Sequence, residues 1–136
     1  MFSVGVDIVE ISRFKNARYL KRVAEFFLTK KEISFAFKDA RKYQHLASRF
    51  VVKEAVAKAM PEPIKFKEFE IIKHLEKPAV RFLKSKFNKY LVAVSLSHNY
   101  NSAIGFALVK YKTDQPPNYS NKIRWTKKFS KPKKAL

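Results

Sequence analysis

Apolar residues alternate with other residues at the start of the chain. Every second position is apolar: Phe2, Val4, Val6 and Ile8. The intervening positions are Ser3, Gly5, Asp7 and Val9. Because successive side chains of a strand point to opposite faces, the alternation predicts a β-strand over residues 2–9, with Asp7 near its end.

Three helices are expected after this strand. Apolar residues recur at helical spacing at Phe14, Ala17, Leu20, Ala24 and Phe27. They predict a helix over about 13–26, with Ser12 as its N-cap. Thr29 and Glu32 then have the spacing of a capping box, which predicts a short helix running to about Phe37.

The longest helix is expected over about 40–60. Pro61 and Pro63 would end it, because proline lacks a backbone N–H and disfavours helical conformation in the residue before it. Its predicted core-facing residues are Leu46, Ala47, Phe50, Val51 and Ala55.

The second half of the chain has strand patterns. We predict strands over about 67–74, 79–83, 91–97 and 102–111. Lys77-Pro78 indicates a turn, and the four residues 98–101 indicate a hairpin connection. One strand, then helices, then several strands is an order typical of an α+β fold with an antiparallel sheet packed with helices.

The chain is strongly basic. Its 136 residues are expected to form one domain over 1–113 and a basic C-terminal extension over 114–136. The net charge is +19, from 30 Lys and Arg against 11 Asp and Glu. Such an excess favours a nucleic acid, an anionic membrane surface or an acidic protein as partner, although a general bias toward lysine would produce it too. In the nucleic-acid alternative, the aromatic contacts would come from Tyr119, Trp125 and Phe129.

The features of exported and membrane proteins are missing from the sequence. There is no cysteine, and no apolar run approaches the roughly 20 residues of a membrane span. The N-terminal segment carries Asp7 and Glu10 and no basic stretch, unlike a signal peptide. We therefore expect a cytoplasmic protein with no membrane span.

The segment from Arg49 to Lys58 holds the first candidate chemistry. Glu54 lies there among Arg49, Lys53 and Lys58. A carboxylate can hold a hard metal ion while neighbouring cations neutralise phosphates, which suits a metal-assisted phosphoryl-type transfer. The alternative is an exposed helix face on which Glu54 pairs with Lys58.

Further candidate groups lie elsewhere in the chain. Asp7 could supply the second carboxylate of a magnesium site with Glu54, or simply end its strand. His98 could contact a phosphate or transfer a proton, or be a polar turn residue. Glu10 and Arg13 have the spacing of a local ion pair. With only two glycines, the chain has no glycine-rich phosphate loop.

Five blocks occur in a recognisable order: Gly5–Arg13, Leu28–Glu32, Arg49–Lys58, Lys77-Pro78 and Val94–His98. Together they resemble the motifs of the holo-acyl-carrier-protein synthases, the small bacterial 4'-phosphopantetheinyl transferases. The resemblance covers about residues 2–111. It implies a 4'-phosphopantetheinyl transferase-like fold and a homotrimer with sites at its subunit interfaces.

The resemblance also implies a reaction and its residues. The family transfers 4'-phosphopantetheine from coenzyme A to a serine of apo acyl carrier protein, with Mg2+, and releases adenosine 3',5'-bisphosphate, in support of fatty acid and lipid synthesis. Asp7 and Glu54 match the magnesium ligands and, with Lys58, the catalytic residues. Contacts to coenzyme A are implied for Arg49, Lys53, Lys58, Ser97 and His98, the last from a neighbouring subunit. Arg13 matches a contact to the acidic carrier.

Two points stay open within this resemblance. The serine proton could go to Glu54 or to a metal-bound water oriented by Asp7. The family usually has a glycine-containing loop after its long helix, whereas Met60–Ile64 has two prolines and no glycine. A catalytically weak member that binds coenzyme A or the carrier is therefore a further alternative.

Overall fold

The computed structural model describes residues 2–112. Its strands and longer helices are β1 (Ser3–Glu10), α1 (Ser12–Lys15), α2 (Leu20–Phe27), α3 (Lys30–Phe37), α4 (Lys42–Ala59), β2 (Phe69–His74), β3 (Lys77–Phe82), β4 (Tyr90–His98) and β5 (Ser102–Tyr111). Short 3-10 turns cover Phe66–Glu68 and Ser85–Phe87. The predicted extension, with its aromatic residues, lies outside the described residues.

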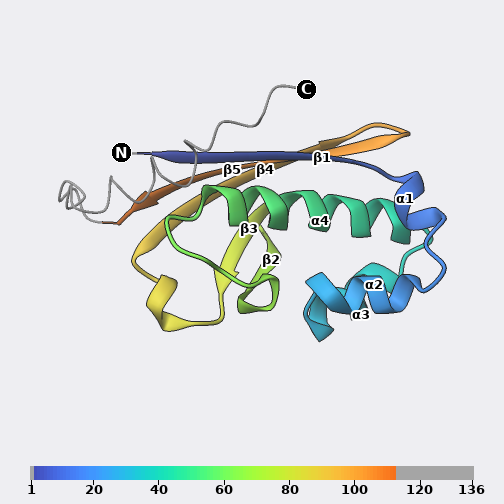
Figure 1. Ribbon diagram of the computed structural model, residues 1–136, viewed down its shortest axis with the longest axis horizontal. Coiled ribbons are helices and arrows are strands. Elements are labelled where there is room, and N and C mark those ends of the chain that lie inside the picture. Colours follow the sequence, from blue (N-terminus) through green and yellow to red (C-terminus); the bar gives the residue numbers. More distant parts are fainter. Residues whose placement is uncertain (1, 113–136) are drawn as a thin grey trace, which may run out of the picture.

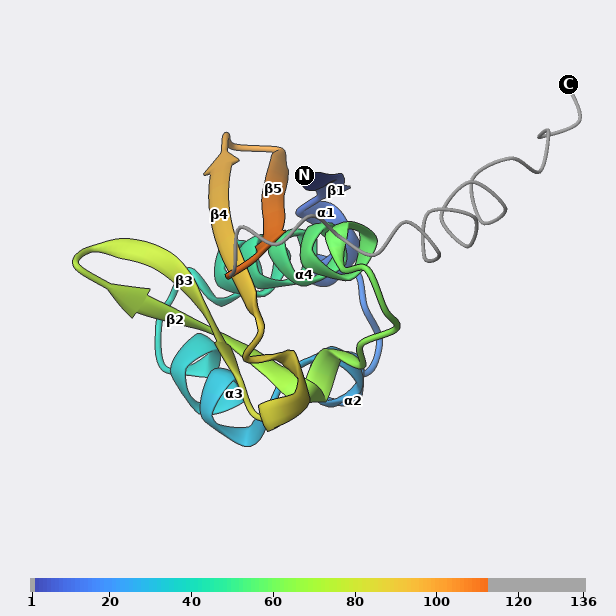
Figure 2. The ribbon, with the colours of Figure 1, turned by 90° about the vertical axis from the view of Figure 1, so that its left-hand side faces the viewer.

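The strands form two antiparallel sheets. One has the order β1-β5-β4, and the other is the β2–β3 hairpin. Helix α4 lies between the three-stranded sheet and a layer made of α2, α3 and the hairpin (Figures 1 and 2). The predicted α+β class with antiparallel sheets and packed helices is therefore confirmed.

The two glycines of the chain let α4 approach the sheet. A Cβ on Gly5 would lie 2.1 Å from the carbonyl oxygen of Ala55, and one on Gly105 would lie 2.6 Å from that of Val51. Any side chain at these positions would force the helix and strand backbones apart. The interface around them is filled by small and β-branched residues, all buried: Val9, Val51, Val52, Ala55, Ala103, Ala107 and Val109.

The other face of the three-stranded sheet is apolar and open. The register pairs Val6 with Phe106 and Ile8 with Ile104 across β1 and β5. Their exposed fractions are 54%, 41%, 66% and 41% in that order. The more apolar side of the first strand therefore faces solvent in the single chain, which is typical of an interaction surface.

The prediction of one continuous helix over 13–26 is wrong. It is broken into α1 and α2, because Asn16 ends α1 and the backbone at Tyr19 is not helical. In one straight helix, Phe14 and Phe27 would point about 140° apart. The break lets both rings pack edge-on against Phe50, at centroid distances of 5.7 and 5.2 Å.

The cap predicted at Ser12 is also wrong. Ile11 occupies the N-cap position of α1, and no side chain caps that end. The capping box before α3 is confirmed, with the Glu32 N–H donating to Thr29 Oγ1 at 3.4 Å and the Thr29 N–H donating to Glu32 Oε1 at 3.2 Å. Within residues 2–112, none of the helices has the length and apolar character needed to cross a membrane.

The turn predicted at Lys77-Pro78 is wrong, because the turn between β2 and β3 lies just before these residues. Pro78 does not form the turn, since it pairs with Lys73 inside the hairpin. Leu75 and Glu76 form it instead, with φ of 47° and 64°. Such turns usually carry Asn or Gly, and neither is present here, so the sequence lacked the usual signal.

Candidate active site

Asp7 and Lys58 meet where β1 packs on the end of α4. The Lys58 ammonium donates to Asp7 Oδ1 at 3.0 Å and to the carbonyl oxygen of Val6 at 3.0 Å. The Asp7 side chain is 20% exposed and that of Lys58 is 51% exposed. The carboxylate is thus largely covered, and the cation borders the solvent.

Glu54 lies one helical turn before Lys58 and faces the same site. Its pKa is raised, first because the carboxylate is partly buried and then because of the negative charge on Asp7, while the positive charges of Lys58 and Arg13 partly offset these effects. Two neighbouring carboxylates repel each other when both are ionised, and a shared cation removes that repulsion. The structure therefore brings Asp7 and Glu54, 47 positions apart in their numbering (54 minus 7), into one electrostatic site.

Asp7 and Glu54 fit a hard divalent cation. Both offer carboxylate oxygens, the ligands that Mg2+ prefers in proteins. Among residues 2–112, no group of three or more His, Asp and Glu side chains is arranged to hold a metal ion. A magnesium ion held by this pair would take its other ligands from water and substrate, which is its common behaviour.

Arg13 reaches the same region from α1. Its guanidinium carbon lies 5.4 Å from the centroid of the Phe50 ring, within cation–π range. The local ion pair with Glu10 does not form, since neither residue takes part in any ion pair of the described chain. Arg13 is therefore turned toward α4 and Glu54.

Lys53 does not reach this site. It lies five residues before Lys58 and about 140° around the helix from it, and it is fully buried. Its ammonium forms an ion pair with Glu32 and donates to three carbonyl oxygens, those of Phe27, Phe66 and Phe69, at 3.0, 2.7 and 2.9 Å. Burial lowers the pKa of Lys53, and Glu32 opposes this shift. These acceptors occupy all the ammonium protons, so the structure does not support the expected phosphate contact.

Arg49 also lies away from Asp7. Its guanidinium carbon is 4.5 Å from the centroid of the Phe35 ring, and its Nε is 4.0 Å from Glu32 Oε2. Burial lowers the pKa of this guanidinium. The side chain is only 16% exposed and packs on the α3 side of α4.

Ser97 and His98 lie at the opposite edge of the sheet from Asp7. They end β4, the third strand in the order β1-β5-β4, and the register places His98 level with Ala103 and Val9. With strands spaced about 4.8 Å apart, the two edges are separated by roughly 10 Å. His98 pairs with buried Ala103 and is on the α4 side of the sheet, whereas Ser97 is on the open side. Within the described residues, neither side chain forms a hydrogen bond with Asp7.

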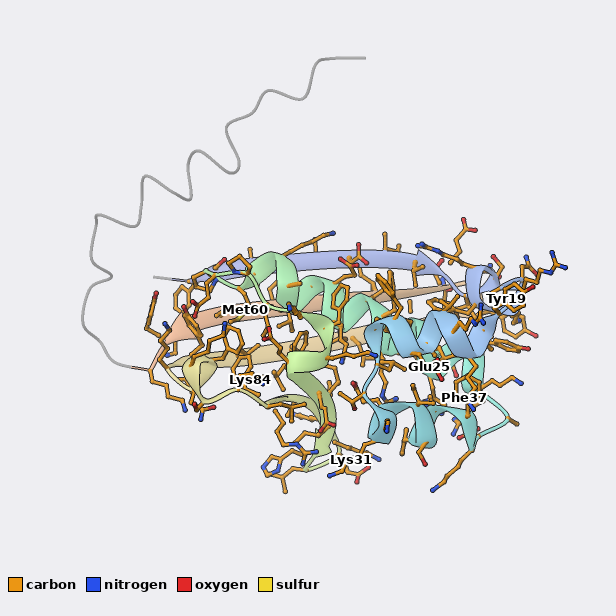
Figure 3. The ribbon with its side chains drawn as sticks, turned by 60° about the horizontal axis from the view of Figure 1, so that its bottom comes forward. Tyr19, Glu25, Lys31, Phe37, Met60 and Lys84 are labelled. Carbon is orange, nitrogen blue, oxygen red and sulfur yellow. The ribbon has the colours of Figure 1, made fainter. Side chains whose placement is uncertain are left out.

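The glycine-free segment Met60–Ile64 is held by contacts that the sequence did not reveal. Met60 is buried at the end of α4 (Figure 3). Glu62 Oε1 accepts a hydrogen bond from the Tyr90 hydroxyl at 3.1 Å and pairs with the Lys89 ammonium at 3.2 Å. Burial, above other causes, raises the pKa of Tyr90 and keeps its phenol a donor. These partners are more than 25 residues away along the chain, so no local pattern indicates them.

Known proteins resemble this chain in sequence and in fold. Residues 3–107 match the model of the 4'-phosphopantetheinyl transferase superfamily. A holo-[acyl-carrier-protein] synthase of Chlorobium phaeovibrioides is 37% identical over 119 residues, which cover 81% of this chain and 95% of that protein.

Solved structures agree with this match. The Helicobacter pylori holo-[acyl-carrier-protein] synthase in complex with coenzyme A has a TM-score of 0.69 and 30% identity, covering 79% of this chain and 99% of that chain. The holo-(acyl-carrier-protein) synthase from Bacillus anthracis in complex with CoA (3',5'-ADP) has a TM-score of 0.69 and 25% identity, covering 81% and 96%.

The matched region contains the whole candidate site. Residues 3–107 include the strand that carries Asp7 and the helix that carries Glu54 and Lys58. Sequence and fold thus lead to the same family that the five blocks indicated. The chain belongs to the 4'-phosphopantetheinyl transferase superfamily.

Proposed function

We propose that this protein is a holo-acyl-carrier-protein synthase. It would transfer the 4'-phosphopantetheine arm of coenzyme A to a serine of an apo acyl carrier protein and so supply carriers for fatty acid and lipid synthesis. The observation that carries the proposal is the convergence of Asp7, Glu54 and Lys58 at one solvent-bordered site. The names of the curated relatives, and the coenzyme A complex of the Helicobacter pylori protein, support it.

The chemistry is a displacement at phosphorus. The serine oxygen forms a bond to the β-phosphorus of coenzyme A, and the bond from that phosphorus to the oxygen bridging to the α-phosphate breaks. Adenosine 3',5'-bisphosphate leaves with this oxygen. Lys58 borders the solvent and offers its ammonium to the pyrophosphate. Glu54 would take the serine proton, because it is the carboxylate of this site that is not paired with the Lys58 ammonium.

Asp7 and Glu54 would hold a magnesium ion. When bound, Mg2+ stabilises negative charge on the reacting phosphates. Asp7 is positioned by its ion pair with Lys58, and Glu54 by the packing of α4 on β1. Both carboxylates therefore belong to regular elements, Asp7 to β1 and Glu54 to α4, which hold side chains more precisely than loops do.

The site is completed by a second copy of the chain. His98 and Ser97 lie at the sheet edge opposite Asp7, and by the family resemblance they would serve the Asp7 site of a neighbouring subunit. The open apolar face of the sheet, which includes Val6, Ile8 and Phe106, offers a surface for such an assembly. By family resemblance the assembly is a homotrimer. Arg49 and Lys53 would stabilise the packing of α4 through their buried contacts with Glu32 and would not contact coenzyme A.

The carrier would dock beside Arg13. Acyl carrier proteins are acidic, and the net charge of +19 attracts them before contact. The loop Met60–Ile64 is anchored through Glu62, which supports an ordered site without the usual glycine. A functional enzyme is therefore favoured over a weak family member.

A transfer assay tests the proposal. The full chain is incubated with an apo acyl carrier protein, coenzyme A and Mg2+, and the carrier is weighed by mass spectrometry. We expect the carrier to gain one phosphopantetheine, and Glu54→Gln to lose nearly all turnover. Full turnover in the presence of a chelator, or in Glu54→Gln, would contradict the assigned mechanism.

A further inference from the structure

Gln44 and His98 lie at the same end of the interface between α4 and the sheet. Gln44 is in the first turn of α4, on the helix face that also carries Ser48 and Val51. Val51 packs against Gly105 of β5, so this face looks onto the sheet. The Gln44 side chain therefore emerges where β4 ends.

The two side chains are in contact there. Gln44 Nε2 lies 2.7 Å from His98 Nδ1, although the residues are 54 positions apart. The amide nitrogen of glutamine can only donate a hydrogen bond. Nδ1 must therefore accept it, and a neutral imidazole then carries its proton on Nε2. No described residue hydrogen-bonds His98 Nε2, and the ring is exposed.

We propose that Gln44 is a positioning residue that holds neutral His98 with its proton on Nε2, so that this nitrogen donates to an anionic oxygen. The opposite tautomer would present a lone pair to such an oxygen and repel it. The tautomer is inferred from the contact between Gln44 Nε2 and His98 Nδ1 and does not depend on the proposed function. That the oxygen belongs to a phosphate of coenzyme A bound by a neighbouring subunit rests on the proposed function.

Nuclear magnetic resonance of the free full-length protein tests the tautomer. The 15N shifts of the imidazole nitrogens are measured in mildly alkaline buffer, which favours the neutral ring. His45 and His74 provide internal comparison, since the Gln44 side chain hydrogen-bonds neither of these rings and His45 contacts Asp39 instead. We expect the proton of His98 on Nε2 in the wild type and a mixture of tautomers in Gln44→Ala.

A near-isosteric variant sharpens this measurement. In Gln44→Glu only acceptor oxygens face Nδ1, so we expect a proton to appear on that nitrogen. A wild-type proton on Nδ1 would overturn the proposal. So would a His98 spectrum that is the same in the wild type, Gln44→Ala and Gln44→Glu.

Kinetics test what the tautomer does. We expect Gln44→Ala to raise the KM for coenzyme A roughly threefold to tenfold, the size of one hydrogen bond, with kcat nearly unchanged. Lys42→Ala in the same helical turn is the control and should change neither value. In a His98→Ala background, Gln44→Ala should have no further effect, and fully additive losses would contradict a role through His98.

The two measurements separate this proposal from the proposed function. If the protein transfers no phosphopantetheine but His98 carries its proton on Nε2 only while Gln44 is present, the enzyme assignment fails and the positioning role stands. If transfer is normal and His98 carries its proton on Nδ1, the positioning role fails and the enzyme assignment stands.

Discussion

Gly5 of β1 lies so close to Ala55 of α4 that a Cβ on the glycine would come within 2.1 Å of the alanine carbonyl oxygen. Asp7, two residues further along the same face of β1, reaches the Lys58 ammonium at 3.0 Å. Both contacts cross the same helix–strand interface. The spacing that glycine allows therefore also sets the geometry of the candidate active site.

Gly5→Ala should damage both stability and activity. The added methyl group meets backbone atoms, which cannot rotate away, so we expect a loss of about 2–4 kcal/mol in the free energy of unfolding. Displacement of β1 would also weaken the Asp7–Lys58 contact and reduce turnover. Chemical denaturation measures the first effect. Ser3→Ala in the same strand is the control, and wild-type stability in Gly5→Ala would show that the backbones are not in contact.

Lys53→Met should be destabilising and not a specific defect in coenzyme A binding. Removing the ammonium leaves the carboxylate of Glu32, which is 3% exposed, with only the more distant Arg49 as a cation partner, at 4.0 Å. Breaking a buried pair in this way costs about 3–5 kcal/mol. The double variant with Glu32→Gln should recover part of this loss. If Lys53→Met instead folds with wild-type stability and raises the KM for coenzyme A, that result would favour the phosphate contact that the resemblance implies for Lys53.

Glu54→Gln should gain stability while it loses activity. The pKa of Glu54 is raised in the native state, so its ionised form opposes folding at neutral pH. Glutamine removes this cost, which we expect to be under about 1 kcal/mol because the site borders solvent. Below the pH range in which carboxyl groups ordinarily titrate, Glu54 is protonated in both the folded and the unfolded wild type. The stability difference between the wild type and Glu54→Gln should therefore vanish there.

Thermal unfolding across this pH range measures the effect. Added Mg2+ should raise the Tm of the wild type and leave that of Glu54→Gln nearly unchanged, because only the wild type has both carboxylates. A stability difference that grows toward acid would contradict the raised pKa. Equal stabilisation of both proteins by Mg2+ would argue against Glu54 as a ligand.

The β2–β3 turn offers a test that is independent of function. Glu76 has a φ of 64°, a region that costs most side chains about 1–2 kcal/mol. Glu76→Gly should therefore be more stable than Glu76→Ala by about 1 kcal/mol. Both variants lose the exposed ion pair with Lys73, so this loss cancels in the comparison. Equal stability of the two variants would mean that the turn is not left-handed at this position.

The sequence by itself determined what depends on local patterns. The capping box of Thr29 and Glu32, the end of α4 before Pro61 and the strand around Asp7 all follow from residues within a few positions of each other. The five blocks determined the family in the same way, because each is a short run of residues. Asp7 and Glu54 could be named as candidates from these blocks, but nothing local required them to meet.

The tertiary structure decided which side of each element is used. Gly5 makes the less apolar side of β1 the packed one, because only that side admits a helix backbone. The helical period turns Lys53 inward and Lys58 toward Asp7, although both are lysines beside Glu54. Sheet order placed His98 at the far edge, beside Gln44 from a distant helix. Such contacts join residues far apart in the chain, so packing and not local pattern determines them.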